Sequence, residues 1–159
     1  MAPNILIIGG VALGPKAAAR AKRLMPDSNI TMIDQGTYIS YGGCGIPYFV
    51  GGDVPQMNGL RTTNAGVVRD EAFFKELKGV NAICHTRALS INRREKTVTV
   101  ENTLTGEKSD MPYDKLVIAT GSSPRIPPIP GADLKNVTSV TCLEAAKAIQ
   151  EQCAARKIN

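Results

Sequence analysis

The sequence predicts an α/β fold in which a parallel sheet carries a crossover helix and a small antiparallel β-meander. Residues 4–8 form an unbroken apolar run of strand length, as expected for a strand buried on both faces. A glycine-rich turn follows, and residues 16–25 are rich in alanine, which favours a helix. Residues 29–33 form a second apolar strand. A strand, a helix and a strand in this order are typical of parallel sheets.

The turn after the first strand has the composition of a dinucleotide-binding loop. Gly9 permits a tight turn, Gly14 lets the helix lie close to the sheet, and Val11 replaces the second glycine of the usual motif. We expect Pro15 at the first helical position. Asp34 ends the second strand, where its carboxylate can accept hydrogen bonds from a ribose. The sequence therefore predicts a Rossmann-like site with a pyrophosphate at the helix N-terminus. The expected cofactor residues in this part of the chain are Gly9, Gly10, Val11, Ala12, Gly14, Asp34 and Gln35.

Cys44 lies in a glycine-rich segment, with glycines at positions 42, 43 and 45. Such a segment suits a turn in which bare backbone approaches a ligand and leaves the sulfur facing it. Residues 46–50 read as a short helix with Pro47 near its first turn, and a thiol at a helix N-terminus is favoured as the thiolate. The alternative is a buried, inert cysteine. The glycines and the preceding cofactor motif favour a reactive residue.

The rest of the chain reads as scaffold around these two segments. The expected elements are a polar loop over residues 51–65, a helix over 68–78, strands over 81–84, 89–92, 97–101 and 115–119, a turn at 105–106, a proline-rich connector over 124–130, and a helix from a capping box at 141–144 to about 156. The only histidine, His85, ends a strand and is expected to be structural rather than a catalytic base.

Composition excludes several classes of function. The net charge of +5 comes from scattered Lys and Arg, and the chain has only four Tyr, three Phe and no Trp, so we expect no nucleic-acid partner. An anionic cofactor or substrate accounts for the excess of positively charged residues. The four cysteines show no C-x-x-C and no zinc spacing, so neither a metal site nor a disulfide framework is expected. With no membrane-length apolar stretch and no signal peptide, the predicted location is cytoplasmic.

Four segments resemble the N-terminal FAD-binding part of the pyridine nucleotide-disulfide oxidoreductases. They are IIGGVALG with the helix after it, MIDQG, YISYGGCGIPYFVGG, and residues 111–131. Because Cys44 has no partner cysteine nearby, the resemblance is to the single-cysteine branch. That branch holds coenzyme A-disulfide reductases, NADH oxidases and peroxidases, and NADH-dependent persulfide or polysulfide reductases. Gly43 stands where coenzyme A-disulfide reductases generally have asparagine, which leaves the substrate open.

The resemblance implies an incomplete FAD-binding domain over residues 1–131. Residues 132–159 would then be a connector and a helix that lead towards an absent NAD(P)H-binding domain. It also implies that Ala119, Thr120 and Gly121 approach the FAD, and that the backbone of Ala88 runs beside the adenine. On this basis the chain looks like the first third of an enzyme that forms a homodimer at full length, and the chain alone is expected to be inactive.

The chemistry implied by the resemblance is the reduction of a sulfur substrate. NAD(P)H would reduce FAD, and electrons would pass to a disulfide, persulfide or polysulfide through Cys44, with Ser40 hydrogen-bonded to the sulfur or to the substrate. One alternative is an NADH oxidase or peroxidase in which Cys44 cycles through a sulfenic acid. A second is a non-catalytic flavin-binding or electron-transfer module, which would have no need of the Cys44 segment.

A basic stripe on the first helix is the candidate substrate site. Lys16, Arg20 and Arg23 share one helical face. In the coenzyme A-disulfide reductases, residues of this helix contact the coenzyme A phosphates, and Arg20 and Arg23 align with such positions. The other interpretation is a solvated helix face made of good helix formers.

Overall fold

The computed structural model describes residues 2–135 and 137–156, which fall into two units. Residues 2–41 and 61–120 form the first unit, and residues 42–60, 121–135 and 137–156 form the second. The domain boundary expected between residues 131 and 132 stays a prediction.

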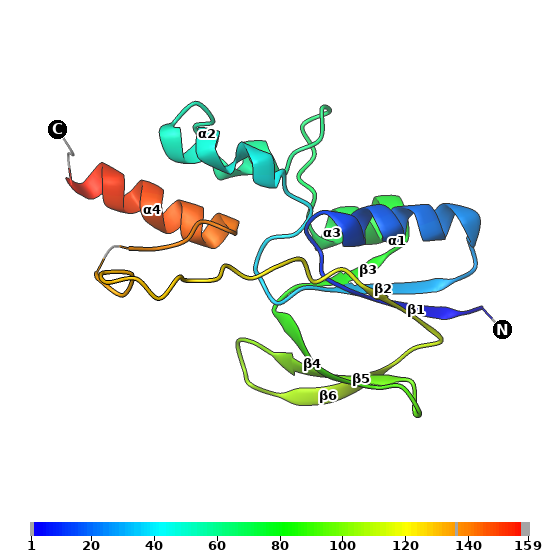
Figure 1. Ribbon diagram of the computed structural model, residues 1–159. Helices are drawn as coiled ribbons and strands as arrows, with labels where there is room; N and C mark the ends of the chain where they lie inside the picture. Colours follow the sequence, from blue (N-terminus) through cyan, green and yellow to red (C-terminus); the bar gives the residue numbers. More distant parts are fainter. Residues whose placement is uncertain (1, 136, 157–159) are drawn as a thin grey trace. The chain divides into compact units, whose positions relative to one another are not determined.

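A four-stranded parallel sheet forms the centre of the first unit (Figure 1). Its strands are β3 (Asn81–Ile83), β2 (Asn29–Ile33), β1 (Asn4–Ile8) and β7 (Lys115–Ile118), in that order. Helix α1 (Leu13–Leu24) connects β1 to β2. Four of the five β1 residues are buried, as expected for a central strand of a parallel sheet. The predicted α/β class is confirmed.

Helices α1 and α3 (Glu71–Lys78) cover one face of this sheet. Ala18 of α1 and Phe74 of α3 are buried against apolar side chains of β1, β2 and β3. The predicted start of α3 at Val68 is wrong, because Val68 forms a β-bridge with Thr62. The helix begins instead after Asp70, whose Oδ1 accepts a hydrogen bond of 2.9 Å from the N–H of Phe73.

An antiparallel meander covers the other face of the sheet. It consists of β4 (Thr86–Asn92), β5 (Thr97–Asn102) and β6 (Lys108–Pro112), with β5 in the middle. Val98 and Val100 of β5 pack with the β1 and β2 side chains that point away from the helices. The first unit therefore has three layers: helices, parallel sheet and meander (Figure 1).

The second unit holds the cysteine segment and the last helix. A 3-10 turn, η1 (Gly43–Gly45), leads into α2 (Ile46–Gly51), and η2 (Met57–Leu60) lies within the segment expected to be a polar loop. Helix α4 (Leu143–Arg156) lies beside α2, and Gln150 Nε2 donates a 3.0 Å hydrogen bond to the carbonyl oxygen of Phe49. Phe49 and Leu143 are buried, so both helices contribute to an apolar interior.

The described helices can be compared in length and apolar composition with membrane-spanning helices. None of the helices within residues 2–135 and 137–156 combines the length and the apolar composition that a membrane span needs.

Candidate functional site

The glycine turn after β1 is packed so closely that side chains are excluded. Gly9 has φ +110°, in the region that favours glycine, and a Cβ there would overlap the carbonyl oxygen of Ala119. A Cβ at Gly14 would overlap the carbonyl oxygen of Gly9. The start of α1 therefore lies directly against the end of β1, as the glycine pattern predicted.

Within the described residues, no side chain caps the N-terminus of α1. Ala12 is the N-cap residue and cannot supply a side-chain cap, and the first turn has no acidic residue. The first N–H groups of a helix and its dipole together favour negative charge at this end. Pro15 is the third helical residue, not the first as predicted, because α1 begins at Leu13.

Asp34 joins three segments at the carboxyl end of the sheet. Its Oδ2 accepts a 2.6 Å hydrogen bond from the N–H of Gly10, and its Oδ1 accepts one of 2.8 Å from Gly36. Its carbonyl oxygen accepts a 2.8 Å bond from Thr86, the first residue of β4. Each carboxylate oxygen has a second lone pair, so the residue can still accept hydrogen bonds from a ribose.

Ser40 is held on the glycine turn. Its N–H donates a 2.8 Å hydrogen bond to the carbonyl oxygen of Gly10, and its φ of +52° lies in the left-handed region. The residue is only 8% exposed. A non-glycine residue in this conformation persists where its surroundings fix it. Its expected hydrogen bond to the Cys44 sulfur or to the substrate stays a prediction.

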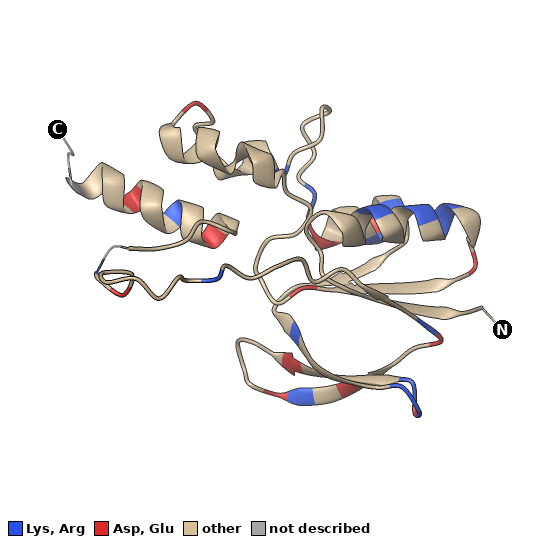
Figure 2. Ribbon diagram, in the orientation of Figure 1, with Lys and Arg blue, Asp and Glu red and all other residues tan. Residues whose placement is uncertain are grey.

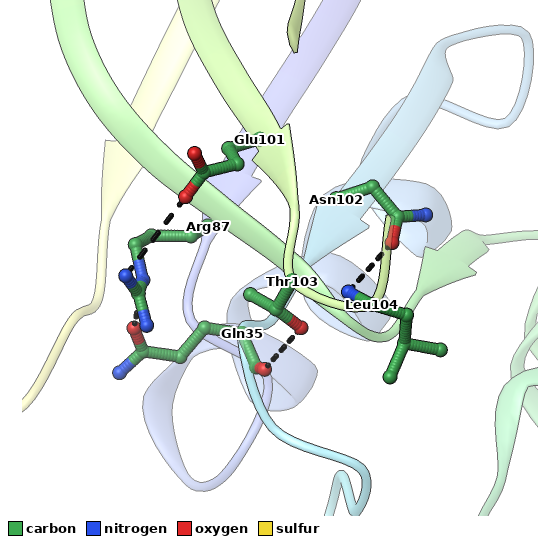
Figure 3. A network of polar contacts seen from close by, with 6 residues as sticks. All are labelled: Gln35, Arg87, Glu101, Asn102, Thr103 and Leu104. Carbon is green, nitrogen blue, oxygen red and sulfur yellow. Dashed lines mark hydrogen bonds and ion pairs between the residues drawn. The ribbon is translucent and has the colours of Figure 1, made fainter. Parts of the chain in front are cut away.

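A polar network extends from Gln35 into the meander (Figure 3). Arg87 Nε donates a 3.2 Å hydrogen bond to Gln35 Oε1, and Thr103 Oγ1 donates one of 3.4 Å to the carbonyl oxygen of Gln35. Arg87 Nη1 also lies 3.9 Å from Glu101 Oε2. These contacts fix β4 and β5 against the end of β2.

Two of the remaining predicted cofactor positions lie at the carboxyl end of a strand of the parallel sheet. Ala119 and Thr120 directly follow β7, and the N–H of Ala119 donates a 2.7 Å hydrogen bond to Ile8. Gly121 has φ +67°, and Ala88 is half-buried on β4. Parallel sheets bind nucleotides outside these strand ends. The glycine turn, the open end of α1 and Asp34 therefore fit an adenine dinucleotide. Val11 is half-buried and Ala12 exposed in the turn.

Cys44 is exposed, which contradicts the alternative of a buried, inert cysteine. It lies in the η1 turn just before α2, rather than within the first turn of that helix. The N–H of Gly42 donates a 2.8 Å hydrogen bond to the carbonyl oxygen of Leu60, and a Cβ at Gly45 would overlap the side chain of Leu60. Of the three flanking glycines, Gly45 is the one that packs closely on Leu60, whereas a Cβ at Gly43 would meet no atom within 4 Å.

The thiol of Cys84, for which no role was predicted, has a different environment from that of Cys44. Burial, the carboxylates of Glu71 and Asp34 and a hydrogen bond to Glu71 raise the pKa of its thiol from 9.0 to about 12, against a smaller opposite effect of Arg61. The N–H of Cys84 also donates a 2.7 Å hydrogen bond to Glu71 Oε1. This thiol stays protonated and is a poor nucleophile. Glu71 and Cys84 are adjacent only in space, so no local pattern could have paired them.

The basic stripe lies on the exposed face of α1. Lys16, Arg20 and Arg23 are exposed, whereas Ala18 is fully buried against the sheet. Figure 2 shows basic residues along this helix. Exposure suits both a phosphate-binding surface and a solvated helix face.

Metal binding has no structural support in the described part of the chain. No group of three or more His, Cys, Asp or Glu side chains in residues 2–135 and 137–156 could hold an ion.

Comparisons with known proteins agree with this geometry. The coenzyme A disulfide reductase of Staphylococcus haemolyticus is 34% identical over 119 residues, which are 75% of this chain and 26% of that protein. The NADH oxidase of Enterococcus faecalis is 33% identical over 136 residues, which are 84% of this chain and 28% of that protein. The structure of an NAD-dependent persulfide reductase from A. fulgidus is 43% identical, with a TM-score of 0.91, over 96% of this chain and 28% of that chain.

The chain thus spans between a quarter and a third of the length of these relatives. The family model for the pyridine nucleotide-disulphide oxidoreductases matches residues 3–159, nearly the entire sequence. The chain therefore belongs to the pyridine nucleotide-disulphide oxidoreductase family.

Proposed function

We propose that the protein is an FAD-dependent NAD(P)H oxidoreductase that reduces a disulfide, persulfide or polysulfide through Cys44. The observation that carries this proposal is that Cys44 is exposed and lies in a turn flanked by glycines, in a chain whose parallel sheet also ends in a dinucleotide-binding turn. The family is one of FAD-dependent enzymes that use NADH or NADPH. A chain whose only task was to bind a nucleotide would not need this cysteine segment.

The residues at the sheet end would hold FAD by its adenosine diphosphate half. The open N-terminus of α1 would bind the pyrophosphate, and Asp34 would accept hydrogen bonds from the ribose. Gly9 and Gly14 would keep the backbone bare at the closest approach. When bound, FAD supplies the two electrons, taken from NAD(P)H, that reduce the oxidised cysteine.

Cys44 would carry the sulfur chemistry. Its thiolate attacks one sulfur of the substrate S–S bond, forms a new S–S bond to the enzyme, and releases the other sulfur as a thiolate that takes up a proton. Two electrons and a proton then break the enzyme–substrate S–S bond, release the second thiol, and restore the Cys44 thiolate. The exposure of Cys44 is what a substrate of variable size requires.

Oxygen or peroxide reduction is the competing function, since the Enterococcus relative is an NADH oxidase. In that case Cys44 would be oxidised to a sulfenic acid, which two electrons and two protons return to the thiol with release of water.

Steady-state kinetics of the protein at its native length would separate these functions. NADH consumption is measured with coenzyme A disulfide, polysulfide, oxygen and hydrogen peroxide, in the parent and in Cys44→Ser, with Cys153→Ser as the matched exposed-thiol control. We expect turnover with a sulfur substrate that falls at least 100-fold in Cys44→Ser and stays unchanged in Cys153→Ser. Full sulfur-reductase turnover in Cys44→Ser would refute the role of this residue, and a preference for oxygen or peroxide would favour the oxidase.

The setting of this activity is part of the same proposal. We place the protein in the cytoplasm, as a homodimer at full length, acting on a small sulfur substrate that can be linked to coenzyme A. Arg20 and Arg23 on α1 are the proposed contacts to coenzyme A phosphates, because both are exposed cations on the helix whose other end meets the pyrophosphate.

A further inference from the structure

We propose that Arg87 recognises the purine base of the adenine dinucleotide, with its guanidinium lying against the face of the ring. This proposal rests on the FAD site described under the proposed function. It assigns a side chain to the part of the cofactor for which sequence reasoning offered only backbone contacts.

Arg87 is tied to the residue that takes the ribose. The carbonyl oxygen of Asp34 accepts a hydrogen bond from the N–H of Thr86, which precedes Arg87 on β4. Arg87 Nε donates to the side chain of Gln35, which follows Asp34. The start of β4 and the end of β2 are therefore linked both through the backbone and through these two side chains.

The chemical order of the ligand then sets where the base lies. An adenine dinucleotide presents pyrophosphate, ribose and base in sequence. With the pyrophosphate at the turn that contains Gly10 and the ribose at Asp34, the base extends past Asp34 on the side away from that turn. One carboxylate oxygen of Asp34 binds Gly10 and the other binds Gly36, so Gln35 and Gly36 mark that far side. Arg87 lies there, in contact with Gln35.

The guanidinium of Arg87 is both oriented and accessible. Gln35 and Glu101 hold it from two sides, as Figure 3 shows. The separation of 3.9 Å from Glu101 is long for an ion pair, and the Arg87 side chain remains 53% exposed. A planar cation on a half-exposed side chain can stack on an aromatic ring, and its hydrogen bond to Gln35 restricts its orientation before the ligand arrives.

The test measures binding of FAD and ADP to the apoprotein at its native length by titration calorimetry. Arg87→Ala is compared with Arg93→Ala, which removes the same charge from an exposed arginine in the turn at the end of the same strand. We expect the Kd of ADP and of FAD to rise about tenfold in Arg87→Ala, and to change less than twofold in Arg93→Ala. Arg87→Lys, which keeps the charge but loses the planar group, is expected to bind ADP within threefold of Arg87→Ala.

The outcomes separate this inference from the proposed function. Failure of the parent apoprotein to bind FAD would overturn the FAD site itself. A parent that binds FAD, with Arg87→Ala binding ADP as tightly as Arg93→Ala does, would overturn the role of Arg87 alone. A lower Tm of the apoprotein without a change in Kd would show that Arg87 stabilises the contact between β2 and β4 and does not bind the base. Full recovery by lysine would refute stacking. If Arg87→Ala does not fold, Arg87→Gln, which retains a donor for Gln35, replaces it.

Discussion

The thiol of Cys84 is expected to resist alkylation, and Glu71→Gln is expected to increase its reactivity. Burial, followed by the Glu71 and Asp34 carboxylates, raises the pKa of Cys84 from 9.0 to about 12. Since the thiolate is the reactive species, this rise lowers the reactive fraction at pH 8 by about a thousandfold relative to an unperturbed thiol.

The substitution Glu71→Gln isolates the charge. Glutamine keeps an oxygen that can accept the 2.7 Å hydrogen bond from the N–H of Cys84, but it removes the negative charge. Burial is the largest cause of the raised pKa and is unchanged. We therefore expect the labelling rate of Cys84 to increase on the order of tenfold, while remaining below that of an unperturbed thiol.

Iodoacetamide labelling at pH 8, followed by mass spectrometry of the peptides, gives the rate of each cysteine separately. Exposed Cys153 serves as the internal reference in the parent and in Glu71→Gln. Labelling of Cys84 within tenfold of Cys153 in the parent would show that the thiol is not protected. Equal rates for Cys84 in parent and variant would show that Glu71 has no electrostatic effect on it.

The other predictions concern stability and substrate binding. Gly14→Ala places a Cβ on the carbonyl oxygen of Gly9, so α1 must shift. We expect the free energy of unfolding to fall by about 2 kcal/mol and the Tm in calorimetry to fall by roughly 4–8 °C, with weaker FAD retention. Asp34→Ala removes two hydrogen bonds from backbone N–H groups, and urea denaturation is expected to show a loss of about 3 kcal/mol, whereas an unchanged midpoint would mean that these bonds contribute nothing. The folded-state pKa of Cys84 is raised, so its contribution to stability is fully present below pH 9 and is lost as pH rises towards about 12. The urea midpoint of the parent should therefore fall over that pH range by more than the midpoint of Cys84→Ala. Arg23→Glu should raise KM for coenzyme A persulfide and leave polysulfide turnover unchanged, and an equal effect on both substrates would leave this helix face as plain surface.

Local sequence patterns predicted the parallel sheet well. The apolar runs gave β1 and β2 with the bounds that the structure shows, because a buried parallel strand needs continuous hydrophobic residues. The start of α3 was predicted three residues too early, at Val68 instead of Glu71. Val68 instead pairs with Thr62 in a β-bridge, and Asp70 is the N-cap of the helix.

Contacts between distant residues could not be predicted in this way. Gln35 and Arg87 are 52 positions apart, and Gln150 reaches Phe49 across 101 positions. A hydrogen bond of this kind depends on the completed fold and leaves no periodic trace in the sequence. The same holds for the Asp34 carboxylate, which was expected to serve a ribose. Its bonds to two backbone N–H groups appear only once the turn and the end of β2 are brought together.

The position of β1 in the middle of the sheet has a consequence for synthesis of the chain. β1 is made long before its neighbour β7, which is paired with it residue for residue from Ile5↔Lys115 to Ile8↔Ile118. At ribosomal rates of about 5–20 residues per second, roughly 5–20 s pass before β7 exists. During that time one edge of an apolar strand has unpaired N–H and C=O groups and resembles a template for aggregation. We therefore expect slower translation over residues 9–114 to increase aggregation of the nascent chain, because it lengthens the time for which this edge of β1 is unpaired.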